Sequence, residues 1–427
     1  MRSTEFPASE HTQLLPGIQG NQDYIESGRI QCGHSQNASK TTKPDLAPLL
    51  TVNFMSFMSG VNEGSWSLLI PCLKSYYGIS DHTVALIFPS YAAGYFVTAC
   101  CNGAFVHYLG QRATMFLGAL GFLAAFSAIM QGFSFPVTVA FMVVQGFGAA
   151  LLTASENVYI AKLPNSTWLF SILHAVYGAG ATVTPLVSTM ILAHDLRWNF
   201  IYLFLSTVAF INICCMLVGF RNVKLDDKAL QSSASNKISY KEAVFNRITM
   251  LGTIYIAIFV GIQLTFGSWG YIYLTEGRQG NEEIMGYVVT GFWGGMAIGR
   301  LFLGYLANRF GEKSLTSICN SMSLILVGQL WLSNDIVIVC IVFVVVGFLQ
   351  APVFTTAIAL ICKLLPRELH ATALGCIAAG TSVGAAFFPF ITGALSEIYG
   401  ISTFPVVCFA MLAVMQCIWM ILPDHRS

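Results

Sequence analysis

The chain has 427 residues, of which 55% are apolar and only 10% are charged, and its formal net charge at pH 7 is +1. A soluble domain carries roughly 25% charged residues, so this composition excludes an ordinary water-soluble protein and indicates one that is solvated mainly by lipid. The small net charge offers no basic surface to a nucleic acid. The 12 cysteines form no C-x-x-C pair, so we predict neither a metal site nor another cofactor.

Twelve apolar runs follow one another from residue 47, with short breaks between most of them. Each is long enough for a helix that crosses a hydrocarbon layer of about 30 Å. Because backbone N–H and C=O groups cannot remain unpaired in lipid, we expect these runs to be helices. They lie near residues 47–70, 83–107, 112–133, 137–161, 167–193, 198–220, 249–275, 284–308, 313–333, 335–362, 370–393 and 401–422.

The longest and most charged break, at residues 221–248, divides these runs into two sets of six. We therefore predict an all-α membrane protein with one six-helix bundle at 47–220 and a second at 249–422. Residues 221–248 would be a cytosolic linker, and 1–46 and 423–427 would be cytosolic tails. The first tail is rich in Ser, Thr, Gln, Asn and Gly and poor in aromatic residues, a composition typical of disordered segments.

Lysine and arginine are distributed unequally between the two sides of the predicted bundles. With the N-terminal tail in the cytosol, 17 of the 21 lie on the cytosolic side, and only Lys74, Arg197 and Arg278 lie on the other. Arg300 lies within a span. Because cytosolic loops carry the excess of Lys and Arg in membrane proteins, we expect both termini in the cytosol.

The stretch Tyr287–Lys313 is apolar but rich in glycine, and the first half of the chain contains a weaker copy of it. Matching residues, there and further along the chain, are all 201 positions apart. A constant offset of nearly half the chain indicates two homologous halves, which is how many secondary transporters are built. The pairs are Gly94 and Gly295, Gly103 and Gly304, Gly110 and Gly311, Arg112 and Lys313, Gly146-Phe147 and Gly347-Phe348, and Lys162 and Lys363.

The break after the second span has the sequence GAFVHYLGQR at 103–112, which resembles the signature loop of the major facilitator superfamily. Its second-half counterpart is GYLANRFGEK at 304–313. The resemblance implies the superfamily fold, with twelve transmembrane helices in two pseudo-symmetric six-helix bundles, and a transporter rather than an enzyme. In the family an aspartate in this loop helps to latch the halves together, whereas this chain has His107 and Asn308 at that position.

Further segments resemble one branch of the superfamily, the fucose-permease-like proteins with their fungal and sodium-dependent glucose-transporter-like members. This resemblance implies a small organic solute, sugar-like or a polyol, and coupling to protons or sodium. Two positions depart from the branch, because Thr153 stands where it often has an acid and Gln263 where many relatives carry glutamate. The segments that carry the resemblance are Asn62-Glu63, Leu173–Pro185, Gly267–Trp269 with Tyr273-Leu274, and Phe292–Arg300.

Three charged side chains inside the spans are candidates for coupling or gating. A carboxylate within a membrane is costly unless it is paired, neutralised or facing water, so Glu63 is the first candidate to carry a proton. Its alternative role is a protonated acid that ties two helices together. Glu156 lies about 9 Å from the end of its span, where it lines a vestibule or is a hydrated structural acid. Arg300 lies roughly 12 Å deep, where it pairs with an acid or an anionic substrate group, or snorkels to the surface and braces the halves.

Polar and aromatic side chains within the spans are the candidates for substrate binding. Amide, imidazole and hydroxyl groups can bond to substrate hydroxyls, and aromatic rings can stack on a sugar ring. Each also has a structural alternative, as a hydrogen bond between helices or as core packing. The candidates are Asn62, Tyr91, Asn157, His174, Tyr177, Gln263, Trp269 and Trp293.

These observations predict a secondary transporter that moves a small organic solute by alternating access, with protons or sodium as the coupling ion and the lipid bilayer as its surroundings. An exporter of amphipathic metabolites or drugs is the alternative. A sensor would need a long signalling domain, and a membrane enzyme would need a motif such as HExxH or paired aspartates. Residence in the plasma membrane or in a vacuolar or endosomal membrane is expected.

Overall fold

The computed structural model describes residues 45–164, 166–221, 244–366 and 369–423. Within these ranges the chain is helical and contains no strand. The predicted N-terminal tail, apart from residues 45 and 46, lies outside them. So do residues 222–243 of the predicted linker and the last four residues of the predicted C-terminal tail.

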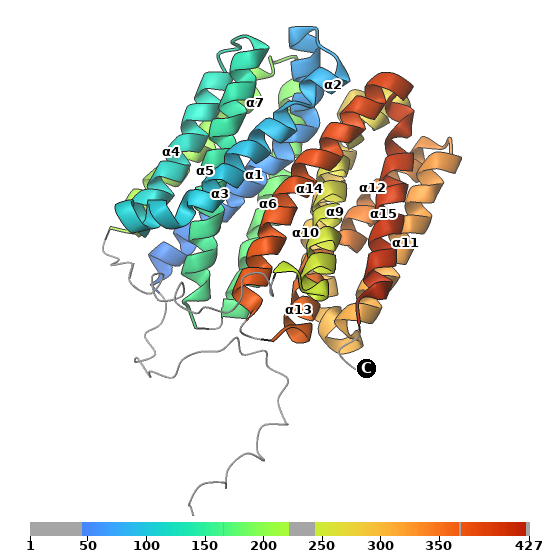
Figure 1. Cartoon of the computed structure of the whole chain (residues 1–427). Coiled ribbons are helices and arrows are strands. Elements are labelled where there is room, and N and C mark those ends of the chain that lie inside the picture. The colour runs from blue at the N-terminus through green and yellow to red at the C-terminus, as the bar shows by residue number, and fades with distance from the viewer. Residues whose placement is uncertain (1–44, 165, 222–243, 367–368, 424–427) are drawn as a thin grey trace, which may run out of the picture. The chain divides into compact units, whose positions relative to one another are not determined.

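A helix is present at the position of each predicted span (Figure 1). The second span is made by α2 and α3, the seventh by α9 and η3, and the tenth by α12 and α13. The first-half helices are α1 (Leu46–Tyr77), α2 (Asp81–Val84), α3 (Ile87–Leu109), α4 (Gln111–Ile129), α5 (Phe135–Ala161), α6 (Ser166–Ala193) and α7 (Asn199–Gly219). The second-half helices are α9 (Arg247–Ile272), η3 (Tyr273–Gly277), α10 (Glu282–Phe310), α11 (Glu312–Leu332), α12 (Ile336–Gln350), α13 (Val353–Leu364), α14 (His370–Tyr399), η5 (Ile401–Thr403) and α15 (Phe404–Ile421).

Ten helices among the described residues are long and apolar enough to cross a membrane by composition alone. The two long helices that fall outside this measure are α1 and α10, with 32 and 29 residues. Both are long enough to span the hydrocarbon layer. They contain the buried Asn62 and the half-buried Glu63 and Arg300, whereas the third charged candidate, Glu156, lies in the apolar helix α5.

The two halves repeat the same contacts at the same offset of 201 residues. A Cβ atom on Gly94 would overlap the carbonyl of Val143, and one on Gly295 would overlap that of Val344. Equally, a Cβ on Gly146 would meet the Tyr91 carbonyl, and one on Gly347 that of Phe292. Helix α3 therefore packs on α5 as α10 packs on α12, and the predicted internal duplication is confirmed.

The turns after α3 and α10 are also equivalent. Gly110 ends α3 with a φ of 80°, and Gly311 ends α10 with a φ of 89°, a backbone region that favours glycine. Close to each turn a lysine donates across to the following helix. Lys162 Nζ lies 3.4 Å from Gln111 Oε1. In the second half Lys363 Nζ lies 2.5 Å from Glu312 Oε1 at the matching positions.

Glycines also bring further helices together within each half. Gly180 of α6 meets the Phe57 carbonyl of α1, and Gly384 of α14 meets the Ala257 carbonyl of α9. The halves meet one another where α1 packs on α9, α3 on α14, and α6 on α10. Figure 1 shows these helices in the middle of the molecule, with α4 and α7 outside them in the first half and α11 and α15 in the second.

We expect Gly146→Ala to lower the temperature at which the purified protein loses its folded, monodisperse form, because the added methyl group must push α3 away from α5. Overpacking of this kind destabilises a core by about 1–3 kcal/mol. Gly347→Ala should do the same in the second half. Gly103→Ala is the matched control, since its Cβ would meet nothing within 4 Å. Equal thermal midpoints for the Gly103 and Gly146 variants would contradict this packing.

Candidate functional site

A network of polar side chains crosses the first half at the middle of α1. Asn62 is buried there, and its Nδ2 atom lies 3.5 Å from the hydroxyl of Tyr91 on α3. The Nε2 atom of Gln145 on α5 donates to the Asn62 Oδ1 atom. Gln145 is itself 2% exposed, so its amide has been removed from solvent to make this bond. Three helices thus place amide and hydroxyl groups around Asn62.

Aromatic rings line the same region. The Trp66 ring packs edge-on against Tyr91, with centroids 5.5 Å apart, and stacks on Phe88 at 5.4 Å. Tyr95 follows Tyr91 one turn along α3 and forms a side-chain hydrogen bond with Thr153 of α5. The result is an apolar wall beside the polar network, an arrangement that suits a ligand with both hydroxyl groups and an apolar face.

The second half contributes Arg300 of α10, whose side chain reaches across to α6. Its Nη1 atom donates to the His174 carbonyl at 3.1 Å, and the guanidinium lies 5.5 Å from the centroid of the Tyr177 ring. Gly178 makes this approach possible, because a Cβ there would lie 3.0 Å from the Cβ of Ala297. Arg300 therefore connects the two halves through α6, where it contacts the His174 carbonyl and the Tyr177 ring.

Glu63 and Arg300 interact electrostatically. No salt bridge forms between this guanidinium and a carboxylate of the described residues. One carboxylate oxygen of Glu63 is buried and has no hydrogen-bond partner among them. An acid from one half and a base from the other thus lie close enough for their charges to interact, without an ion pair between them. The unpartnered Glu63 oxygen calls for a ligand, a water molecule or a proton.

The second acid, Glu156 of α5, lies toward the end of its helix that carries Lys162. Glu156 is buried and one of its oxygens also has no partner among the described residues, whereas Asn157 beside it is exposed. Glu156 interacts electrostatically with Tyr95. We call Asn62, Glu63, Tyr91 and Gln145 the Glu63 layer of the site. Glu156 belongs to a second layer, which lies nearer to the Lys162 end of α5.

The remaining candidates lie in the second half. Gln263 of α9 is buried. Trp269 is fully buried and its Nε1 atom donates to the Pro389 carbonyl at 2.9 Å. Trp293 is buried too, and packs against Gly267. In this conformation the two tryptophans are part of the packing of the second half rather than of the Glu63 layer.

Sequence reasoning did not single out Gln145, Trp66 or Tyr95, which the structure places around the predicted residues. Gln145 carried the strongest available signal, because it is a polar residue in the middle of a long apolar span. The aromatic residues carried none, since the chain contains 55 of them and their neighbours depend on how α1, α3 and α5 pack.

A cluster of charged side chains closes the end of the protein where α1, η3 and α14 end. Lys74 of α1 lies 2.8 Å from Asp81 and 3.3 Å from Glu276 of η3. Ser396 of α14 donates to Asp81 at 2.7 Å, and the backbone N–H of His82 donates to Glu397 at 3.4 Å. We call these groups the gate cluster. They connect the first half to the second at this end.

The other end of the protein carries most of the basic residues and is called the basic end here. Three glycines within its helices have open space beside them. A Cβ on Gly103 of α3, Gly304 of α10 or Gly375 of α14 would meet no heavy atom within 4 Å. The described basic residues at this end are Arg112, Lys162, Arg221, Arg247, Arg309, Lys313 and Lys363.

A model of the Major Facilitator Superfamily matches residues 52–282 and 251–427. The chain is 27% identical to Bypass of stop codon protein 6 of Saccharomyces cerevisiae over 406 residues, which cover 86% of this chain and 81% of that protein. It is 22% identical to the glucose/mannose transporter GlcP of Bacillus subtilis over 356 residues, or 79% and 85% of the two chains.

Among solved structures, a D-xylose-proton symporter superposes with a TM-score of 0.75 at 14% identity, over 89% of this chain and 98% of that one. The nucleoside transporter NupG gives a TM-score of 0.69 at 12% identity, over 88% and 98% of the two chains. At these identities the likeness shows the fold alone.

We expect Lys74→Ala to weaken closure of the end that the gate cluster holds. The Lys74 and Glu276 side chains are 27% and 51% exposed, so their ion pair contributes at most about 1 kcal/mol, which shifts the ratio of closed to open molecules by up to about fivefold. Nitroxide labels at Asp195 and Gln279, one in each half, would report the opening as a longer distance in a double electron–electron resonance experiment. Arg197→Ala, an exposed residue outside the gate cluster, is the control, and an equal shift in both variants would contradict the assignment.

Proposed function

The chain belongs to the major facilitator superfamily, and from that premise we propose that it transports a small polyol or sugar-like solute by alternating access, coupled to protons through Glu63. The observation that carries the proposal is that Glu63 on α1 and Arg300 on α10, one from each half, lie close enough for their charges to interact. A solute bound between them would contact both halves at once, so its binding can govern how the halves move.

The polar groups around Glu63 support a hydroxylated, uncharged solute. Asn62, Gln145 and Tyr91 supply amide and hydroxyl groups, and Trp66 supplies a ring face beside them. The charges of Glu63 and Arg300 offset one another, which leaves the layer without a net charge that would select an ion. Two of the related proteins carry names that specify glucose, mannose or xylose.

Proton coupling is supported by the position of Glu63. A half-buried carboxyl group with one unpartnered oxygen can hold a proton in one state and share Arg300 in another. Arg300 then distinguishes the two forms of Glu63, because it attracts only the ionised one. One neighbour in fold is named as a proton symporter. Glu156, one layer lower, is the second candidate carrier.

The state of the two ends supports alternating access. The gate cluster joins the halves at one end, while glycines of α3, α10 and α14 face open space at the basic end. Since basic residues mark the cytosolic side, we assign the basic end to the cytosol and this structure to an inward-facing state. Both termini would then be cytosolic, in a plasma, vacuolar or endosomal membrane.

Replacement of Glu63 by Gln tests the coupling. In proteoliposomes supplied with a panel of labelled hexoses, pentoses and polyols, E63Q should lose uptake driven by an inward proton gradient and keep exchange of labelled for unlabelled solute. The reason is that exchange needs binding and movement of the halves but no net proton transfer. Glu282→Gln, an exposed acid at the start of α10, should keep both activities. Retention of driven uptake by E63Q would rule out Glu63 as the carrier, and efflux of the solute by the wild type would favour an exporter.

Replacement of Arg300 by Gln tests the binding layer. A hydrogen bond to a charged group contributes about 1.5–3 kcal/mol, so we expect the apparent affinity for the transported solute to fall by about tenfold or more. Arg309→Gln, at an exposed position of the same helix, is the matched control. An unchanged half-saturation concentration for exchange in R300Q would show that Arg300 does not contact the solute.

A further inference from the structure

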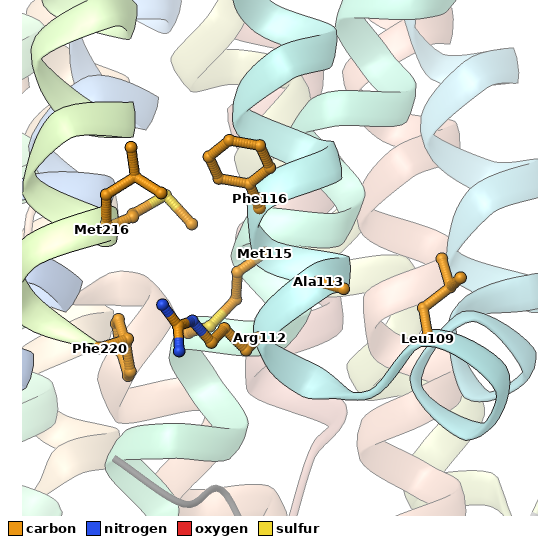
Figure 2. A pocket seen from close by; sticks show the side chains of 8 residues that line it. Leu109, Arg112, Ala113, Met115, Phe116, Met216 and Phe220 are labelled. Carbon is orange, nitrogen blue, oxygen red and sulfur yellow. The ribbon is translucent and has the colours of Figure 1, made fainter. Parts of the chain in front are cut away.

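A crevice on the first half lies between α4 and α7 at the basic end, well away from the Glu63 layer. Its volume is about 400 Å³. Figure 2 shows the Arg112 side chain extending from the first turn of α4 toward Met216 and Phe220 of α7. The lining residues are Leu109, Arg112, Ala113, Met115, Phe116, Met216, Leu217 and Phe220.

The crevice is lined by apolar side chains except at Arg112. Seven of the lining side chains are apolar and the eighth is the guanidinium of Arg112, with no acid among them. Leu109 and Leu217 are each 50% exposed, so the crevice opens on the outer surface of the bundle, where the protein meets lipid. Arg112 lies at the start of α4 and α7 ends at Gly219, so the cation is at the level of the headgroups and the apolar lining extends toward the acyl chains.

In the second half, side chains of the protein itself occupy the position that matches this crevice. Lys313 corresponds to Arg112, and its Nζ atom donates to the Leu422 carbonyl at 2.5 Å. The Nε1 atom of Trp419 donates to the Lys313 carbonyl at 3.0 Å. Trp419 and Leu422 are both fully buried. The second-half cation thus caps the end of α15, whereas the first-half cation lines an open crevice, although the two positions derive from the same duplication.

We propose that the α4–α7 crevice binds an anionic phospholipid from the leaflet at the basic end. One acyl chain packs against Leu109, Phe116 and Leu217, which are accessible apolar residues of the lining, and the lipid phosphate accepts hydrogen bonds from Arg112. Guanidinium groups bind phosphate oxygens in a bidentate geometry, and anionic lipids are attracted to basic residues near the membrane surface. The proposal does not depend on which solute the protein transports, or on whether Glu63 carries a proton.

Photo-crosslinking in a bilayer tests this site directly. The full-length protein is reconstituted in phosphatidylcholine vesicles that contain a small fraction of phosphatidylserine with a diazirine on its acyl chain, or the same fraction of the matching phosphatidylcholine. After irradiation, lipid adducts are located by mass spectrometry. We expect adducts at 109–116 and 216–220, with about fivefold more labelling by phosphatidylserine, the ratio expected from about 1 kcal/mol for one basic residue near the surface.

Four variants separate the phosphate contact from the apolar contact. Arg112→Gln should remove the preference for phosphatidylserine, and Arg112→Lys should keep most of it. Lys313→Gln, at the matching position of the second half, should leave the preference unchanged. Ala113→Trp should fill the crevice and reduce labelling by both lipids.

Several results would overturn the proposal. Equal labelling of the wild type by both lipids would indicate an apolar surface without selection by charge. A preference that survives Arg112→Gln, or that is lost equally in Lys313→Gln, would exclude Arg112 as the phosphate contact. Undiminished labelling of the monodisperse Ala113→Trp variant would place the acyl chain elsewhere.

Discussion

The structure has to shelter two charged side chains inside its membrane spans, Glu63 in one half and Arg300 in the other. Neither charge would be stable in lipid alone. Glu63 is held on α1 in the first half and Arg300 on α10 in the second, with the α6 carbonyl of His174 as a further contact of the guanidinium. A membrane-spanning chain can keep such a pair only between two bundles that shield it from the acyl chains.

Glycine residues allow the helices within each bundle to pack closely. Within each bundle, helix backbones approach one another closely at glycines. These are Gly94 and Gly146 in the first half and Gly295 and Gly347 in the second. Such contacts are short-range and contain no interlocking side chains, so a pair of helices can separate or slide without breaking a network of large residues. The ion pair between Lys74 and Glu276 in the gate cluster is partly exposed and therefore contributes little stability. Such a contact can form and break during a transport cycle.

Much of the fold followed from the sequence, because lipid restricts the chain to helices and a span needs about 20 apolar residues. The offset of 201 residues predicted two homologous halves, and the structure adds that Gly146 and Gly347 make matching helix contacts within them. The site was harder to predict. Glu63 and Arg300 stand out because charge is rare in a span, but Gln145 and Trp66 matter through which helices face each other, and Trp269 resembles a ligand residue although it packs in the core.

The central claim is that Glu63 and Arg300 stabilise one another across the two halves. A double-mutant cycle of thermal unfolding on the full-length protein, with Glu63→Gln, Arg300→Gln and both together, measures this coupling without knowledge of the solute. The account predicts that the second substitution costs clearly less than the same substitution in the wild type, with a coupling free energy above about 1 kcal/mol. Additivity of the two substitutions to within about 0.5 kcal/mol would contradict it.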